Sequence, residues 1–226
     1  MISKLPAWIW TGAWVLAFVG GSVNVVGLMS WEHQAITHLT GTSSMLAEAL
    51  ATWNINQIQH WTAMLSSFVA GAVVSGFIIQ DSTLRLGRRY HAALLLESAL
   101  LLVAAHLLMR DMDAGLYVAA AACGLQNAMV STYSGSVIRT THLSGMFTDL
   151  GIFLGHKLRR LPMDQRRFIL CLVVISGFIA GGVTGAVLFR RLEFGSLFVP
   201  AVITSILAGM HAFALYWKSR LTPPKV

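Results

Sequence analysis

The sequence has few charged residues and few cysteines. Asp, Glu, Lys and Arg make up only 11% of its 226 residues, whereas soluble domains carry about a quarter. Hydrophobic residues make up 56%. This composition excludes an ordinary soluble domain and predicts an all-α, polytopic protein whose partner is the lipid bilayer. The two cysteines, Cys123 and Cys171, lie in apolar runs without metal-ligand spacing, so we expect them to pack as small side chains.

The signatures of enzymes and metalloproteins are missing as well. The chain has no glycine-rich phosphate loop, no nucleophile elbow and no pair of histidines at i and i+4. We therefore expect no enzymatic activity, no cofactor and no metal. The net charge of +7 does not indicate a nucleic-acid partner. The basic residues cluster in short segments between apolar runs, where they orient membrane spans.

Six apolar segments are long enough to cross a hydrocarbon core of about 30 Å. The predicted spans are residues 8–29, 59–80, 90–109, 114–133, 168–189 and 196–217. The first follows Lys4 and is longer than the core of a signal peptide, so we expect it to remain in the protein as a span.

A polar stretch between the first two spans recurs between the fourth and the fifth. Residues 36–50 read ITHLTGTSSMLAEAL and residues 140–154 read TTHLSGMFTDLGIFL. With an offset of 104, the residues that coincide include Thr37 with Thr141, His38 with His142, Leu39 with Leu143 and Gly41 with Gly145. Internal repeats indicate repeated architecture. We infer one membrane domain, residues 1–226, built from two similar halves, residues 1–110 and 111–226.

The duplication continues into the spans. Small residues recur at every fourth position of the second and fifth spans, and they are Ser67, Gly71 and Ser75, and Gly177, Gly181 and Gly185. Such stripes let helices approach closely, so we expect these two spans to form a packed central pair. The same stripes suit the association of two copies, which makes a homodimer an expected partner.

The distribution of Lys and Arg supports six spans. Thirteen of the 16 Lys and Arg residues fall on the side of both termini, leaving three on the opposite side. The thirteen are Lys4, Arg85, Arg88, Arg89, Arg139, Lys157, Arg159, Arg160, Arg166, Arg167, Lys218, Arg220 and Lys225. The division is less uneven if each polar stretch crosses fully. Because basic residues concentrate on the cytoplasmic side, both termini are predicted to be cytoplasmic.

Three spans per half is an odd number, so the second half crosses the membrane in the opposite direction to the first. This is the inverted-repeat arrangement of many transporters and channels. Each polar stretch would then form a short re-entrant or half helix, over residues 41–52 and 145–156, capped by Thr40 and Ser144. Their N-termini would meet near the midplane and offer unpaired N–H groups and a partial positive charge.

These stretches and the first and fourth spans supply the residues expected to bind a small polar or anionic solute. The candidates are Asn24, His38, Thr40, Gly41, Ser44, Glu48, Gln126, Asn127, Thr141, His142, Ser144, Gly145, Thr148 and Asp149. The amides of the two spans line a cavity or join helices to each other. The two histidines stabilise the turns or relay protons. Asp149 interacts with its helix dipole or binds a cation.

Glu97 is an ionisable residue inside the third predicted span. Such a residue is a functional candidate because burial of its charge is unfavourable. Two roles are open: coupling to a proton or ion, and a hydrogen bond between helices. His106 and His211, near the ends of the third and sixth spans, fit interfacial positions better than ligand positions.

GGSVNVVGL followed by HLTG, and GLQN followed by RTTHLSGMFTDLG, resemble the YoaK-like family of bacterial multipass membrane proteins, grouped as a domain of unknown function. The resemblance covers essentially the whole chain. It implies a multipass protein of the bacterial inner membrane with about six spans and no assigned substrate. Two positions depart from the family pattern: the family commonly has Asp where this chain has Asn24, and Asn where this chain has Thr42.

Together these features favour a passive or ion-coupled transporter of a small polar or anionic solute, or a channel of similar architecture. The alternative from another class is a non-transporting membrane scaffold, since small-residue stripes also suit helix association. A membrane-embedded enzyme would rest only on His38, His142, Glu97 and Asp149 as acid–base groups.

Overall fold

The computed structural model describes residues 8–79, 89–134 and 139–221, and within these ranges every regular element is helical. In chain order the elements are α1 (Trp8–Met29), α2 (Leu39–Ala51), α3 (Ile55–Ile78), α4 (Tyr90–Leu108), α5 (Ala114–Ser134), α6 (Leu143–Leu158), α7 (Gln165–Leu192), the 3-10 helix η2 (Glu193–Leu197) and α8 (Phe198–Leu221). The all-α prediction is therefore confirmed. Lys4, Gln80, Arg85, Arg88 and Lys225 lie outside the described residues.

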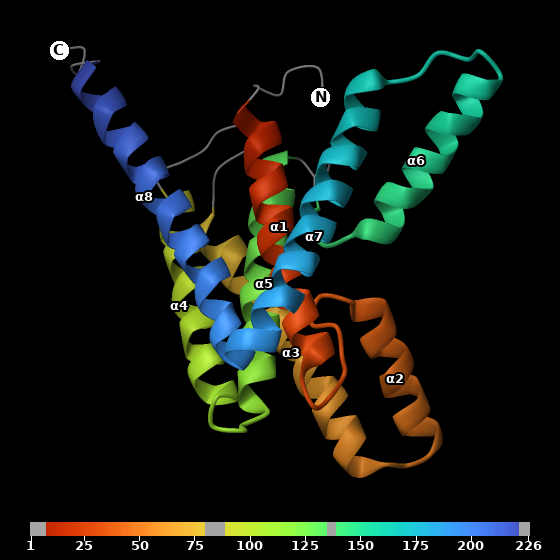
Figure 1. Cartoon of the computed structure of the whole chain (residues 1–226), viewed down its shortest axis with the longest axis vertical. Coiled ribbons are helices and arrows are strands. Elements are labelled where there is room, and N and C mark those ends of the chain that lie inside the picture. The colour runs from red at the N-terminus through yellow and green to blue at the C-terminus, as the bar shows by residue number, and fades with distance from the viewer. Residues whose placement is uncertain (1–7, 80–88, 135–138, 222–226) are drawn as a thin grey trace.

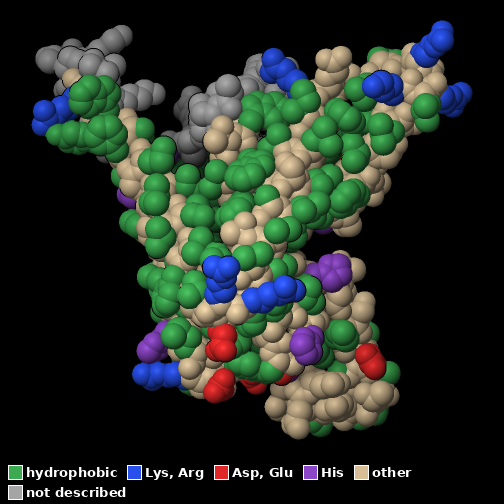
Figure 2. Space-filling model, in the orientation of Figure 1, with side chains coloured by type: hydrophobic (Ala, Val, Ile, Leu, Met, Phe, Trp, Pro, Cys, Tyr) green, Lys and Arg blue, Asp and Glu red, His purple; other side chains and the backbone are tan. Residues whose placement is uncertain are grey.

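Four described stretches are long and apolar enough to cross a membrane: Ile9–Met29, Ile55–Ile78, Tyr90–Leu108 and Gln165–Trp217. The last of them contains both α7 and α8. Large apolar side chains cover the outside of these helices, among them Phe77, Val183 and Phe213, and Figure 2 shows apolar side chains over much of the visible face. Such a surface is stable in lipid and unfavourable in water. The chain is a membrane-type helical protein.

Polar side chains extend α3 and α7 beyond their predicted starts at residues 59 and 168. Asn54 precedes α3 and its side chain accepts a hydrogen bond from the N–H of Gln57. Asp164 precedes α7 and accepts from the N–H groups of Arg166 and Arg167. These caps satisfy N–H groups that have no partner within the helix. Hydropathy does not detect them, because the first turns of both helices contain several polar residues.

The helices pair across the chain. α1 packs against α7, α3 packs against α5, and α4 packs against both α5 and α8. α2 contacts α3, and α6 contacts α7 (Figure 1). The expectation that the second and fifth spans form a central pair is wrong, because α3 and α7 make no contact with each other in the described residues.

The small-residue stripes explain this pairing. A Cβ atom on Gly71 of α3 would overlap the carbonyl oxygen of Ala121 of α5. A Cβ atom on Gly181 of α7 would overlap the carbonyl oxygen of Phe18 of α1. Each stripe therefore faces the backbone of a helix from the other half of the sequence, and the close approach is possible because glycine has no side chain.

The glycines of α1 and α5 complete these contacts from the opposite side. A Cβ atom on Gly21 would overlap the carbonyl oxygen of Phe178, and one on Gly124 would overlap that of Phe68. In the pair α1 and α7, and likewise in the pair α3 and α5, each helix has a glycine that contacts the backbone of the other.

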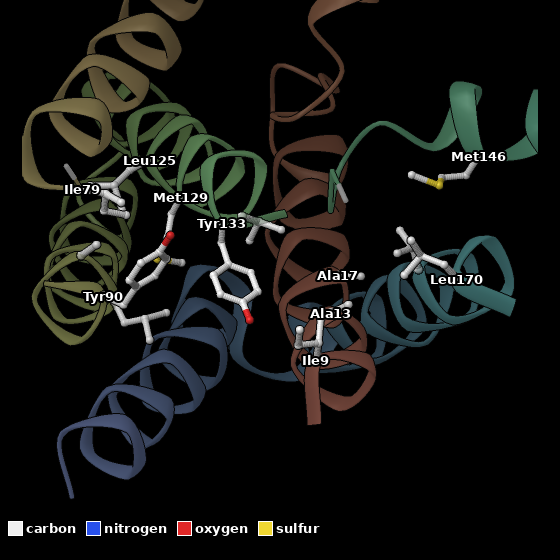
Figure 3. Packing of buried hydrophobic residues seen from close by; sticks show 14 of the residues in the cluster. Ile9, Ala13, Ala17, Ile79, Tyr90, Leu125, Met129, Tyr133, Met146 and Leu170 are labelled. Carbon is white, nitrogen blue, oxygen red and sulfur yellow. The ribbon is translucent and has the colours of Figure 1, made fainter. Parts of the chain in front are cut away.

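Buried apolar side chains form two clusters, one toward each end of the crossing pairs. One contains Ile9, Ala13 and Ala17 of α1 with Leu170 of α7, and Figure 3 shows these beside Tyr90, Leu125, Met129 and Tyr133 from the other helices. The rings of Tyr90 and Tyr133 meet edge to face, 5.8 Å apart. The other cluster includes Met64, Leu101, Leu116 and Leu197. Cys123 and Cys171 are buried free thiols within α5 and α7.

Candidate functional site

The two duplicated stretches start short helices in the same way. α2 begins at Leu39 after the cap residue His38, and α6 begins at Leu143 after the cap residue His142. The two cap residues have nearly the same backbone angles, φ −93° and ψ 68° in one and φ −92° and ψ 62° in the other. Neither side chain makes a capping hydrogen bond, so N–H groups of both first turns point out of the helix end unsatisfied by a cap.

The prediction that Thr40 and Ser144 cap these helices is wrong, because both residues lie inside the first turn. Their carbonyl oxygens accept hydrogen bonds from the hydroxyls of Ser44, at 3.1 Å, and Thr148, at 2.9 Å. Hydroxyls four residues later in a helix bond in this way when no better partner is near.

Each cap histidine lies over the glycine three residues later. A Cβ atom on Gly41 would overlap Cδ2 of the His38 ring, and one on Gly145 would lie 2.7 Å from Nδ1 of the His142 ring. Both histidines are exposed. The glycines therefore allow an imidazole to lie beside the open end of each helix, a contact that the sequence analysis did not predict.

The two short helices point their N-termini toward each other. In Figure 1, α2 runs from the middle of the molecule toward one end, beside α3, and α6 runs from the middle toward the other end, beside α7. Figure 2 shows a hollow in the surface between the lobe that contains α2 and the lobe that contains α6. The N-termini of both helices border this hollow.

The first polar stretch is fastened to α1 by an amide. Oδ1 of Asn24 accepts two hydrogen bonds from Thr37, one from its N–H at 2.9 Å and one from its hydroxyl at 2.7 Å. A second amide, Gln34, donates from Nε2 to the hydroxyl of Thr42 at 3.2 Å. Thr37 and Thr42 are both buried. These bonds hold the reversal between α1 and α2 at the helix start.

The second polar stretch contacts α1 at Gly20, one helical turn before Asn24. Nε2 of Gln126 in α5 donates to the carbonyl oxygen of Leu16 at 2.7 Å and to the hydroxyl of Thr140 at 3.1 Å. A Cβ atom on Gly20 would lie 3.1 Å from Cγ2 of Thr141 and 3.9 Å from Nε2 of Gln126. Gly20 and Asn24 are separated by about 6 Å along the helix axis. Both duplicated stretches therefore meet the same short segment near the middle of α1.

We call Asn24, Thr37, Gln126, Thr140 and Thr141 the central polar cluster. The sequence predicted Asn24, Gln126 and Thr141 as site residues, but Thr37 and Thr140 were missed. Positions 37 and 140 both lie within the duplicated stretches, residues 36–50 and 140–154, so their place in the repeat is the signal that could have found them. Asn127, next to Gln126, has a buried Oδ1 without a hydrogen-bond partner in the described part of the chain.

Other predicted site residues have exposed side chains on the short helices and are not part of the central polar cluster. Thr40, Ser44 and Glu48 are exposed on α2, and Ser144 and Thr148 are exposed on α6. Asp149 accepts a hydrogen bond from Nη2 of Arg167 at 3.0 Å. This ion pair joins α6 to the start of α7. The expected interaction of Asp149 with the helix dipole is wrong, because α6 begins at Leu143 and Asp149 lies beyond its first turn.

Glu97 lies apart from the central polar cluster. Its side chain is 1% exposed on α4, and Oε2 has no hydrogen-bond partner in the described residues. Its neighbour Ser98 joins α4 to α8 by donating to the carbonyl oxygen of Ala201 at 2.7 Å. His106 is exposed in the last turn of α4, and His211 is half-buried in α8 with its ring 6.1 Å from that of His91.

Comparison with known proteins gives a family and no function. A family model described as "Protein of unknown function (DUF1275)" matches residues 12–210. No curated protein matches the chain, and no solved structure matches it. The match confirms the expectation of an uncharacterised family.

Proposed function

The chain belongs to the DUF1275 family, and we propose that it is a transporter of the bacterial inner membrane. It would move a small polar or anionic solute past a site near the membrane midplane, between two inverted halves. A channel of the same architecture is the closest variant, and a transporter differs from it by saturation and slower turnover.

Matched contacts support two inverted halves. The contact of Gly21 with the backbone of Phe178 has its counterpart in that of Gly124 with Phe68. Cap histidines lie over glycines at the start of both α2 and α6. α2 packs on the helix that follows it, and so does α6. The two short helices run toward opposite ends of the molecule (Figure 1), as an inverted repeat requires.

The observation that carries the proposal is the meeting of both polar stretches on one segment of α1. Thr37 bonds to Asn24, and Thr141 lies beside Gly20 one turn away. Polar, non-helical backbone at membrane depth is stable when it is buried in protein or lines a water-filled cavity. A polar solute that passes between the halves would bind to the polar groups of these stretches in place of water.

The two helix N-termini favour a solute with negative charge. An α-helix carries about half a positive elementary charge at its N-terminus, and free N–H groups there bind carboxylates and phosphates. Gly41 and Gly145 would let an anion approach the backbone after the His38 and His142 rings move aside. The basic residues that flank the spans would place both termini in the cytoplasm.

A flux assay with a matched pair of glycine variants tests the proposal. The purified chain in proteoliposomes is challenged with acetate, nitrate, inorganic phosphate and glycerol in turn. Gly145→Leu should abolish the flux of the solute that is carried, because a bulky side chain displaces the His142 ring. Gly151→Leu is the control on the same helix, since nothing lies within 4 Å of a Cβ at that position.

Equal flux through Gly145→Leu and Gly151→Leu would remove the proposed path. If none of the four probes crosses faster than in empty liposomes, the scaffold alternative gains support. Circular dichroism and size-exclusion chromatography must show that both variants are folded.

A further inference from the structure

Three metal-ligating side chains converge at the end of the molecule where α1 finishes and α4 turns into α5. They are Glu32, His60 and Asp113, and one donor atom from each lies within 4.8 Å of the other two. Nε2 of His60 is 4.0 Å from Oε2 of Glu32. The three residues come from the connection after α1, the second turn of α3 and the connection before α5. Only folding brings them together.

The imidazole of His60 is oriented with its free nitrogen toward the carboxylates. Nδ1 lies 2.9 Å from the hydroxyl oxygen of Tyr117 in α5. Nε2 is buried and has no hydrogen-bond partner among the residues that the structure describes. Its distance of 4.0 Å to Oε2 of Glu32 is too long for a hydrogen bond. A buried ring nitrogen without a partner is unfavourable unless something occupies the space in front of it.

One of the two carboxylates is held in place as well. Nε1 of Trp31 donates to Oδ1 of Asp113 at 2.8 Å, and the Trp31 ring packs edge to face on Phe194 at 5.0 Å. This bond fixes the side chain of Asp113, which is otherwise exposed. Both His60 and Asp113 thus have a second residue that orients them, as ligands of protein metal sites usually do.

We propose that Glu32, His60 and Asp113 bind a divalent transition-metal ion, with Zn²⁺ as the best fit. One imidazole with two carboxylates suits Zn²⁺ and similar ions, whereas Ca²⁺ and Mg²⁺ prefer oxygen ligands throughout. Zinc bonds to these atoms are about 2.0 to 2.2 Å long, so small rotations of Glu32 and Asp113 close the site. With Nε2 on the ion, Nδ1–H donates to Tyr117, and water takes a fourth position.

The bound ion would join two connections and one helix. It would fasten the segment between α1 and α2 to the start of α3 and to the turn before α5. This site is separate from the central polar cluster and does not depend on transport. The sequence predicted no metal because these ligands share no local spacing.

Metal titration of the purified, chelator-treated chain in detergent tests the proposal. We expect one equivalent of Zn²⁺ by isothermal titration calorimetry, and visible absorption bands of a low-coordinate site when Co²⁺ is bound. His60→Ala should lower the affinity at least about a hundredfold, and Tyr117→Phe about tenfold, since outer-sphere partners of metal ligands contribute 10- to 100-fold. Asp113→Asn should weaken binding, whereas Asp111→Asn, an exposed neighbour in the same connection, should leave it unchanged.

Three results would overturn the proposal: no saturable binding of Zn²⁺ or Co²⁺ to the folded wild-type chain, wild-type affinity in His60→Ala, or equal losses in Asp113→Asn and Asp111→Asn. Zn²⁺ should also raise the unfolding temperature of the wild-type chain and of Asp111→Asn but not that of His60→Ala. This second readout remains informative if His60→Ala is less stable without metal.

Discussion

Asn24 holds Thr37 by two hydrogen bonds to a single oxygen, so that the middle of α1 and the chain thirteen residues later are one polar unit. Both bonds need only an acceptor at position 24. A carboxylate oxygen serves as well as an amide oxygen, which explains how the YoaK-like pattern can have Asp where this chain has Asn24.

Asn24→Asp should therefore fold with nearly wild-type stability, whereas Asn24→Leu should be destabilised by about 1 to 3 kcal/mol. The leucine would leave the N–H and the hydroxyl of Thr37 buried without an acceptor. Thermal unfolding in detergent, followed by circular dichroism, measures the difference. Equal unfolding temperatures for the two variants would show that Thr37 finds another partner.

Gly181→Ala should destabilise the protein by about 1 to 3 kcal/mol or more, because the added methyl group would force α7 away from the backbone of Phe18. Gly182→Ala is the matched control. Its methyl group would meet Val25 at an ordinary 3.5 Å, and alanine is the better helix former by about 0.5 to 1 kcal/mol. Opposite signs for these neighbours would confirm the close approach of α1 and α7, and equal effects would argue against it.

Single cysteines at positions 40, 44, 144 and 148 should react with water-soluble thiol reagents if the hollow between α2 and α6 is part of a solute path. The cysteine-free background is Cys123→Ala with Cys171→Ala. Reagents added from opposite sides should label the two helices differently in a transporter that alternates its access. Four unreactive cysteines would indicate a sealed interior and favour the scaffold alternative.

Glu97→Gln should preserve the fold, because glutamine has the same shape and the carboxyl oxygen Oε2 loses no hydrogen bond. If Glu97 couples solute movement to protons, the variant should lose the dependence of flux on a pH gradient. Proteoliposome uptake at several gradients measures this. Wild-type pH dependence in the variant would leave Glu97 as a structural residue of α4.

Asp149→Asn should change stability by less than about 1 kcal/mol, since the partner Arg167 is half exposed and such surface pairs contribute little. Thermal unfolding checks this expectation. A loss of flux at unchanged stability would show that Asp149 acts in transport. An unchanged flux would leave it as the link between α6 and α7.

The helices were predictable because apolar runs in a membrane protein have a length set by the bilayer. The prediction for the first span, residues 8–29, coincides with α1, and the other helices differ from their predictions by a few residues at either end. At the starts of α3 and α7 the differences arise at the polar caps Asn54 and Asp164, which depend on the backbone geometry there. The repeat of the polar stretch could also be found from the sequence, because identical residues recur at a fixed offset.

Partners in space were less predictable. The stripes of Gly71 and Gly181 indicated close packing but not which helix packs there, because a stripe of small residues does not specify its partner helix. The histidines at positions 38 and 142 were identified, yet the contact of each ring with the following glycine needed coordinates. Glu32, His60 and Asp113 were missed as a metal site in the sequence analysis, because they are far apart in the chain and show no ligand spacing.

The crossing of α1 with α7 and of α3 with α5 has a consequence for biogenesis. When α1 leaves the ribosome, the helix that will fill its glycine surface has not yet been made, so the early spans must wait in the bilayer with that surface turned to lipid or to an insertion factor. Neither half can reach its final shape alone, and maturation is completed only late in synthesis, when residues near Gly181 arrive.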